Sequence, residues 1–169
     1  MRHVISAYVQ NKPGVLAHVA GMFAARGFNI DSLVVGRTED QRYSRMTIVV
    51  VGDDRTLEQV RKQLAKLVAV VKVRDFGGID YVERDLMLVR VAAEPAQRAE
   101  IVEVVNLFRG RVVDVWRQSI TVELSGSEDK IEAFIDLLKP YGIRELARTG
   151  VIAMQRGKHG DRRGESLEE

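Results

Sequence analysis

The sequence predicts an α+β fold made of two tandem βαββαβ units. Stretches with the alternating apolar pattern of strands and stretches with the apolar spacing of helices follow one another in the order strand, helix, strand, strand, helix, strand, which is the ferredoxin-like pattern. The same order then recurs in the second half of the chain. We therefore expect one domain at 2–77, a linker at 78–82, a second domain at 83–156 and a disordered tail at 157–169.

The first unit begins with alternating residues at 3–10, which are typical of a half-buried strand. Asn11 is a suitable N-cap for the helix that follows, because its side chain can accept a bond from an N–H group of the first turn. Arg26-Gly27 ends this helix, since glycine readily adopts the left-handed conformation found at helix ends. The expected apolar stripe of the helix consists of Leu16, Val19, Ala20 and Phe23.

Three strands and a second helix complete the first unit. We expect the strands at 28–37, 45–51 and 70–76. Asp53 and Asp54 place negative charge at the start of the helix, where the helix dipole favours it. The helix presents one apolar side, formed by Leu57, Val60, Leu64 and Leu67.

The second unit repeats these elements. Pro95 opens its first helix, and Arg109-Gly110 ends that helix in the same way as in the first unit. Ser127 caps its second helix. The expected strands of this unit are those at 86–91, 112–116, 120–124, 143–149 and 151–154.

Composition excludes several classes of function. The 169 residues contain no cysteine, which rules out disulfides, thiolate metal sites and a cysteine nucleophile. Lysine and arginine number 26 against 24 acidic residues, and a net charge of +2 is too small to indicate nucleic-acid binding. No apolar run is long enough for a membrane span, and the N-terminal stretch has the pattern of a strand and not of a signal peptide. We expect a cytoplasmic protein without nucleic-acid or membrane partners.

No catalytic or metal-binding motif occurs in the sequence. It contains no P-loop, no GxGxxG after a strand, no HExxH and no GxSxG. Its histidines, His3, His18 and His159, share no ligand spacing. Acidic pairs such as Glu128-Asp129 are better explained as charges at helix N-termini than as catalytic groups. We therefore predict no catalytic residue and no metal site.

One stretch, 11–31, suits a ligand site built mostly of backbone. Pro13 and Gly14 open a helix whose first N–H groups lack intrahelical partners, and such a helix start suits a small anion such as the carboxylate of an amino acid. Asn11 and Asn29 lie near the two ends of the stretch. Each half on its own is also explained by a capped helix and a glycine turn.

The two halves together are more specific. Residues 11–16 (NKPGVL) followed by 26–33 (RGFNIDSL) resemble the ligand-binding stretch of ACT domains, which are βαββαβ modules that bind amino acids, commonly where two chains meet. The chain is also similar, across roughly 2–156, to the small regulatory subunit of acetolactate synthase. The stretches that carry this wider similarity are 44–48, 57–60, 62–68, 82–89, 108–115 and 147–151.

The resemblance implies a non-catalytic partner of an enzyme. In that family the large subunit carries thiamine diphosphate, FAD and magnesium and joins two 2-keto acids, so no cofactor is expected in this chain. The small subunit raises this activity and makes it sensitive to branched-chain amino acids, usually valine. The expected partners are therefore the catalytic large subunit, a second copy of the chain through its ACT domain, and valine or another branched-chain amino acid.

The resemblance also assigns site residues. Valine is expected between the ACT domains of two chains, which contribute Asn11, Gly14, Val15 and Leu16 from one chain and Asn29 and Ile30 from the other. The second unit starts its first helix at Glu94-Pro95-Ala96, without glycine, so we expect it to serve dimerisation and partner binding. The alternative function is a free-standing ACT-domain amino-acid sensor that regulates another enzyme or a transcription factor.

Overall fold

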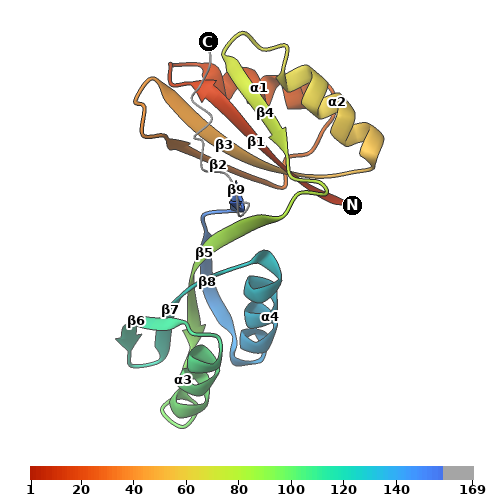
Figure 1. Cartoon of the computed structure of the whole chain (residues 1–169). Coiled ribbons are helices and arrows are strands. Elements are labelled where there is room, and N and C mark those ends of the chain that lie inside the picture. Colours follow the sequence, from red (N-terminus) through yellow and green to blue (C-terminus); the bar gives the residue numbers. More distant parts are fainter. Residues whose placement is uncertain (158–169) are drawn as a thin grey trace.

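The computed structural model describes residues 1–157, and Figure 1 shows the course of the chain. The tail predicted at 157–169 therefore lies, beyond Gly157, outside the described residues. In chain order the elements are β1 (Arg2–Gln10), α1 (Val15–Ala24), β2 (Ser32–Arg37), β3 (Tyr43–Val51), α2 (Asp54–Leu64), β4 (Val70–Asp75), β5 (Tyr81–Ala92), α3 (Arg98–Leu107), β6 (Arg111–Trp116), β7 (Ser119–Gly126), α4 (Glu128–Leu138), the 3₁₀ turn η1 (Lys139–Tyr141), β8 (Ile143–Arg148) and β9 (Ile152–Gln155).

The N-terminal unit is an antiparallel sheet in the order β2-β3-β1-β4, with α1 and α2 on one face (Figure 1). The register places Ile5 opposite Ile48 and Ala7 opposite Met46, and all four side chains are buried. They belong to one cluster with the buried residues of α1 and α2. Alternate residues of each strand thus pack against two amphipathic helices, which gives this unit its own hydrophobic core.

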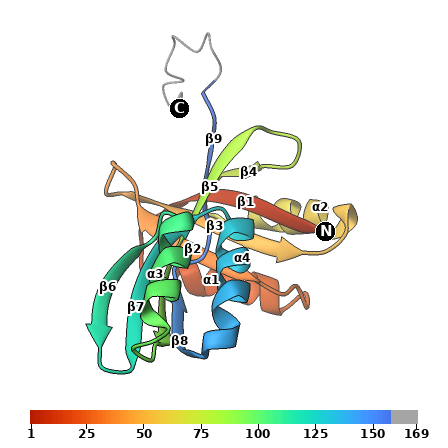
Figure 2. The same cartoon turned by 90° about the horizontal axis from the view of Figure 1, so that it is seen from below.

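The C-terminal unit repeats this arrangement with the strand order β6-β7-β5-β8, and α3 and α4 cover one face of the sheet (Figure 2). Its core is a separate cluster that includes Met87 and Val89 of β5 and Phe134 of α4. Both sheets have the strand order of a βαββαβ unit with the first strand in the middle. The predicted α+β class with two tandem ferredoxin-like units is confirmed.

The long strand β5 joins the two units. Its first residues pair with β9, from Tyr81 opposite Gln155 to Arg84 opposite Ile152, and the rest of the strand pairs with β7 and β8. The ribbon formed by β5 and β9 lies across the helix-free face of the N-terminal sheet (Figure 1). A third apolar cluster fills this contact and consists of Val4, Val49, Phe76, Val151 and Ala153.

Two predicted strand boundaries are wrong. The strand predicted at 28–37 begins at Ser32, so the preceding residues form a loop. The strand predicted at 86–91 begins at Tyr81, because its pairing with β9 extends it towards the N-terminal unit. In both cases the deciding interaction is pairing with another strand, which the local apolar pattern does not contain.

Two features of the helices also differ from the prediction. α3 begins at Arg98 and not at Pro95, because residues 94–97 form a turn in which the N–H of Gln97 donates to the carbonyl of Glu94. The buried face of α1 is rotated by one residue at its start, so that Leu16 is 46% exposed. The buried residues of α1 are Val15, Val19, Met22 and Phe23.

The helices α1 and α3 end with the same hydrogen-bond pattern but on different residues. Gly27 has the left-handed φ of 68° that was predicted after α1. After α3 the left-handed residue is Arg109, with φ of 55°, and not Gly110. Gly110 meets a different requirement, because a Cβ atom there would lie 3.2 Å from the carbonyl oxygen of Glu123 on β7.

Candidate functional site

The loop between β1 and α1 presents a helix start that is open to ligands. Gly14 is the N-terminal flanking residue of α1, with φ of 84°, and a Cβ atom added there would meet no heavy atom within 4 Å. In the described part of the chain, the N–H groups of Leu16 and Ala17 have no backbone acceptor. The positive end of the helix dipole therefore faces unoccupied space, an arrangement that favours an anion.

Asn11 does not cap α1, and that prediction is wrong. The structure records no side-chain cap for this helix, and the Asn11 Nδ2 donates instead to the carbonyl of Gln41, at 2.9 Å. The Asn11 backbone N–H donates to the carbonyl of Arg42, at 2.7 Å, so two bonds tie this residue to the β2–β3 loop. The carboxamide nitrogen is a donor only, so the carboxamide oxygen is the atom of this side chain that can accept from a ligand.

The apolar residues of the predicted site divide into two kinds. The Val15 side chain is 7% exposed and belongs to the N-terminal core, so this residue can offer a ligand its backbone and little else. Leu16 points the other way and leaves nearly half of its surface exposed. Leu16 is therefore the residue of this loop that can form an apolar wall outside the core.

Asn29 and Ile30 lie in the loop between α1 and β2. Asn29 is exposed, and Ile30 is half-buried against the N-terminal core. The Asp31 N–H donates to the carbonyl of Val49, at 2.9 Å, which fixes the loop to β3 just before β2 begins. The loop thus presents one polar side chain and part of an apolar one on a short anchored segment.

A single chain does not bring the two halves of the predicted site together. Gln10, which precedes Asn11, pairs with Tyr43 of β3, whereas Ser32, which follows the Asn29 loop, pairs with Val49. Those positions of β3 are about 20 Å apart along the strand. The ten-residue helix α1 spans a similar length, about 15 Å, between the same two loops. Asn11 and Asn29 of one chain therefore lie at opposite ends of the sheet.

A network around a buried carboxylate connects the Asn29 loop to the C-terminal unit. Asp85 of β5 is 1% exposed and accepts from the Arg148 guanidinium, at 2.6 Å, and from the Thr149 hydroxyl and the Gly150 N–H, each at 3.2 Å. These contacts hold the turn between β8 and β9. The next residue donates back to the N-terminal unit, because the Val151 N–H bonds to the Ser32 Oγ at 3.2 Å.

A second link between the units lies at the start of β1. Arg2 forms ion pairs with Glu83 of β5, at 3.1 Å, and with Glu128 at the start of α4. Burial raises the pKa of the Glu128 carboxyl above its ordinary value, although Arg2 lies beside it. Neither link could be predicted from the sequence, because no local pattern shows which side chains meet across two units.

Among residues 1–157 no cluster of histidine and acidic side chains could hold a metal ion. Within the same residues, no helix is long and apolar enough to cross a membrane.

Comparison with known proteins places this architecture in a class. Residues 5–72 match the model of the small-subunit-like ACT domain of acetohydroxyacid synthase, so the N-terminal unit is an ACT domain. Residues 84–157 match the model of the small subunit of acetolactate synthase. The order of the two matches follows the two units of the fold.

Full-length relatives are similar over nearly the whole chain. A probable acetolactate synthase small subunit from Archaeoglobus fulgidus is 59% identical over 93% of this chain and 98% of that protein. The acetolactate synthase small subunit of Mycolicibacterium smegmatis is 49% identical over 94% and 93% of the two chains. The crystal structure of the small subunit from Thermotoga maritima superposes with a TM-score of 0.86 and 44% identity, covering 94% of this chain and 99% of that one. The chain belongs to the acetolactate synthase small-subunit family.

Proposed function

We propose that this chain is the regulatory subunit of an acetolactate synthase, which activates a catalytic large subunit and makes it sensitive to feedback inhibition by valine or a related branched-chain amino acid. The observation that carries the proposal is the open helix start at Gly14, in an ACT domain of this family. The chain itself is proposed to be non-catalytic and cytoplasmic. Thiamine diphosphate, FAD and magnesium belong, in this proposal, to the large subunit. We retain 2–77 as the amino-acid-binding domain and 83–156 as the dimerisation and partner domain.

The amino-acid site is proposed to lie between two copies of the chain. β1 and β2 are both antiparallel to β3 and so run in the same direction, and β2 is one of the two edge strands of its sheet. If two copies meet at β2 around a twofold axis, the edge strands run antiparallel. The Asn11 end of one sheet then lies beside the Asn29 end of the other. Asn11 of one copy is thus brought beside Asn29 of the other, although the two residues of one chain lie about 20 Å apart along the sheet.

The groups of the two loops match the parts of an aliphatic amino acid. The N–H groups that follow Gly14 can bind the carboxylate, since glycine allows a close approach. The side-chain oxygens of Asn11 and of Asn29 from the second copy can accept from the ammonium group. Leu16 and Ile30 supply apolar surface for the side chain of the ligand. Such a wall discriminates by about 1–3 kcal/mol per methylene, so valine, leucine and isoleucine should bind with graded affinities.

The test combines the chain with the catalytic subunit of the same organism and measures acetolactate formation with and without valine. Stimulation that valine reverses supports the proposal. Amino-acid binding without stimulation instead supports the free-standing sensor. Gly14→Asp should abolish the valine response and keep the stimulation, because a carboxylate would occupy the place of the ligand carboxylate. Gly78→Asp is the matched control, since Gly78 has a similar φ of 71° and equally open surroundings but lies outside the site.

A further inference from the structure

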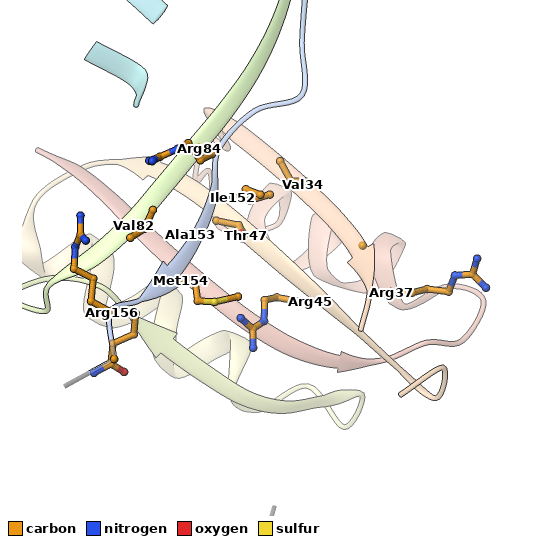
Figure 3. A pocket seen from close by; sticks show the side chains of 13 residues that line it. Val34, Arg37, Arg45, Thr47, Val82, Arg84, Ile152, Ala153, Met154 and Arg156 are labelled. Atoms are coloured by element: carbon orange, nitrogen blue, oxygen red, sulfur yellow. The ribbon is translucent and has the colours of Figure 1, made fainter. Parts of the chain in front are cut away.

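A groove lies on the other side of the N-terminal sheet from its helices, away from the proposed amino-acid site. It has a volume of about 730 Å³ and runs between the helix-free face of the N-terminal sheet and the ribbon of β5 and β9 (Figure 3). Its apolar surface comes from Val34 of β2, Val82 of β5, and Ile152 and Met154 of β9. Ile152 and Met154 are 53% and 64% exposed, so the structure leaves this apolar surface uncovered.

The groove is also positively charged. Four of its lining residues are arginines, namely Arg37, Arg45, Arg84 and Arg156, and among residues 1–157 no acidic residue lines it. The whole chain carries a net charge of only +2, so this concentration is local and does not reflect a basic protein. In the described part of the chain, Arg37 and Arg45 take part in no ion pair, whereas Arg156 pairs with Asp80. Figure 3 shows Arg45 beside Met154, so charge and apolar surface adjoin each other.

The positive charge continues beyond the groove across the sheet. Arg45 of β3 is opposite Gly36 of β2 on one side and Tyr8 of β1 on the other, and Tyr8 is opposite Lys72 of β4. Residues paired in this way point to the same face of an antiparallel sheet. Arg45 and Lys72 therefore both present their charges on the face of the sheet that the helices leave free, with Tyr8 between them.

We propose that this groove docks a segment of the catalytic subunit that carries acidic and aliphatic side chains. Carboxylates suit the guanidinium groups, which bind them in a planar, bidentate way. Aliphatic side chains suit the exposed side chains of Ile152 and Met154. The same groove of a second copy is a poor occupant, because it would bring two sets of arginines together, and the proposed dimer contact uses the edge of β2 and not this face. The flexible thioether of Met154 can adapt to the partner. The inference rests on the proposed regulatory function.

The test measures the affinity of the full-length chain for the catalytic subunit by biolayer interferometry at several salt concentrations. The double variant Arg45→Glu/Arg84→Glu should weaken binding by about tenfold or more and flatten its salt dependence. Met154→Asp, which leaves the arginines intact, should also weaken binding. The matched control is Arg55→Glu/Arg144→Glu, which changes the net charge equally at two exposed arginines outside the groove, and it should bind like the wild type.

Each other outcome overturns the inference in a different way. Valine binding by calorimetry and the mass in analytical ultracentrifugation report whether the variants keep their fold and oligomeric state. Unchanged affinity of both groove variants would show that the catalytic subunit docks elsewhere. A changed oligomeric mass would identify the groove as a contact between copies. Pyrophosphate serves as the small-anion probe: if the wild type binds it and the groove variants do not, while their affinity for the catalytic subunit is unchanged, the groove is a small-anion site. If the wild-type chain does not bind the catalytic subunit at all, the proposed function fails as well.

Discussion

The two βαββαβ units fold alike, but the loops that lead into their first helices differ. In the N-terminal unit the helix starts at Gly14, whose φ is 84° and which leaves the space in front of α1 open. In the C-terminal unit the residue before α3 is Gln97, which has an ordinary right-handed backbone with φ of −94° and closes the turn at residues 94–97. Strand order and helix packing therefore specify the fold, whereas one loop residue decides whether a helix start can receive a ligand.

The helix-free faces of the two sheets also differ. In the N-terminal unit, β5 and β9 cover part of this face through the cluster around Val151 and Ala153. In the C-terminal unit, the corresponding face leaves Leu86 and Leu88 of β5 39% and 44% exposed. One unit thus uses its free face for a contact within the chain, and the other leaves it available.

The largest predicted effect tests whether the two cores are independent. Phe23 and Phe134 are both fully buried, but in separate clusters. Phe134→Ala should destabilise the C-terminal unit by about 3–5 kcal/mol and leave valine binding intact, whereas Phe23→Ala should cost a similar amount and abolish binding, because Phe23 holds α1 in place. Urea denaturation followed by circular dichroism, together with calorimetry, measures both. Loss of valine binding in Phe134→Ala would contradict the separation.

The buried network at the β8–β9 turn should give the next largest effect. Asp85→Ala leaves the Gly150 N–H and part of Arg148 without an acceptor, so we expect a loss of about 3 kcal/mol in the free energy of unfolding. Glu145→Ala is the matched control, because Glu145 pairs with Arg90 on the exposed surface and should cost less than about 1 kcal/mol. Equal effects of the two substitutions in chemical denaturation would argue against a special role for the network.

A smaller effect tests the second loop of the proposed amino-acid site. Asn29→Ala should weaken valine binding about tenfold, since it removes one acceptor for the ammonium group. Asn106→Ala, at an exposed position of α3 in the unit for which we propose no site, should leave valine binding unchanged. Titration calorimetry compares the two. An unchanged affinity in Asn29→Ala would remove this side chain from the site.

The smallest effect compares the two helix ends. Gly27→Ala should destabilise the protein by about 1 kcal/mol, because alanine is strained at positive φ. Arg109→Gly should act in the opposite direction, by about 0.5 kcal/mol, since Arg109 already occupies the left-handed region. Thermal and chemical denaturation give both signs. The same sign for both substitutions would contradict the equivalence of the two ends.

The sequence was sufficient for the order of the elements, because apolar periodicity is local and each unit repeats it. It was insufficient for the loop that holds Asn29. Phe28 and Ile30 extend the apolar alternation of the strand, but the pairing of β2 with β3 begins only at Ser32. The return of β9 across the N-terminal sheet depends on the cluster that joins Val151 and Ala153 to Val4 and Val49, residues that are far apart in sequence. The groove between the N-terminal sheet and the ribbon of β5 and β9 could not be predicted either, because its arginines come from segments that are far apart in sequence.

The candidate site was predicted in part from chemistry and in part from resemblance. The helix start at Gly14 followed from Pro-Gly and an apolar stripe, although the cap assigned to Asn11 is wrong. The pairing of Asn11 with Asn29 of a second chain came from the family and remains a prediction. The structure adds a physical reason for it, because the two loops of one chain lie at opposite ends of the sheet.

The central claim is that the N-terminal unit alone receives a branched-chain amino acid, at a site that two copies share. Titration calorimetry of the full-length chain with valine tests it most directly. The account predicts one valine per chain, no binding in Gly14→Asp, and affinity that falls when the protein is diluted below its dimerisation constant. Two valines per chain, or full binding by Gly14→Asp, would contradict it.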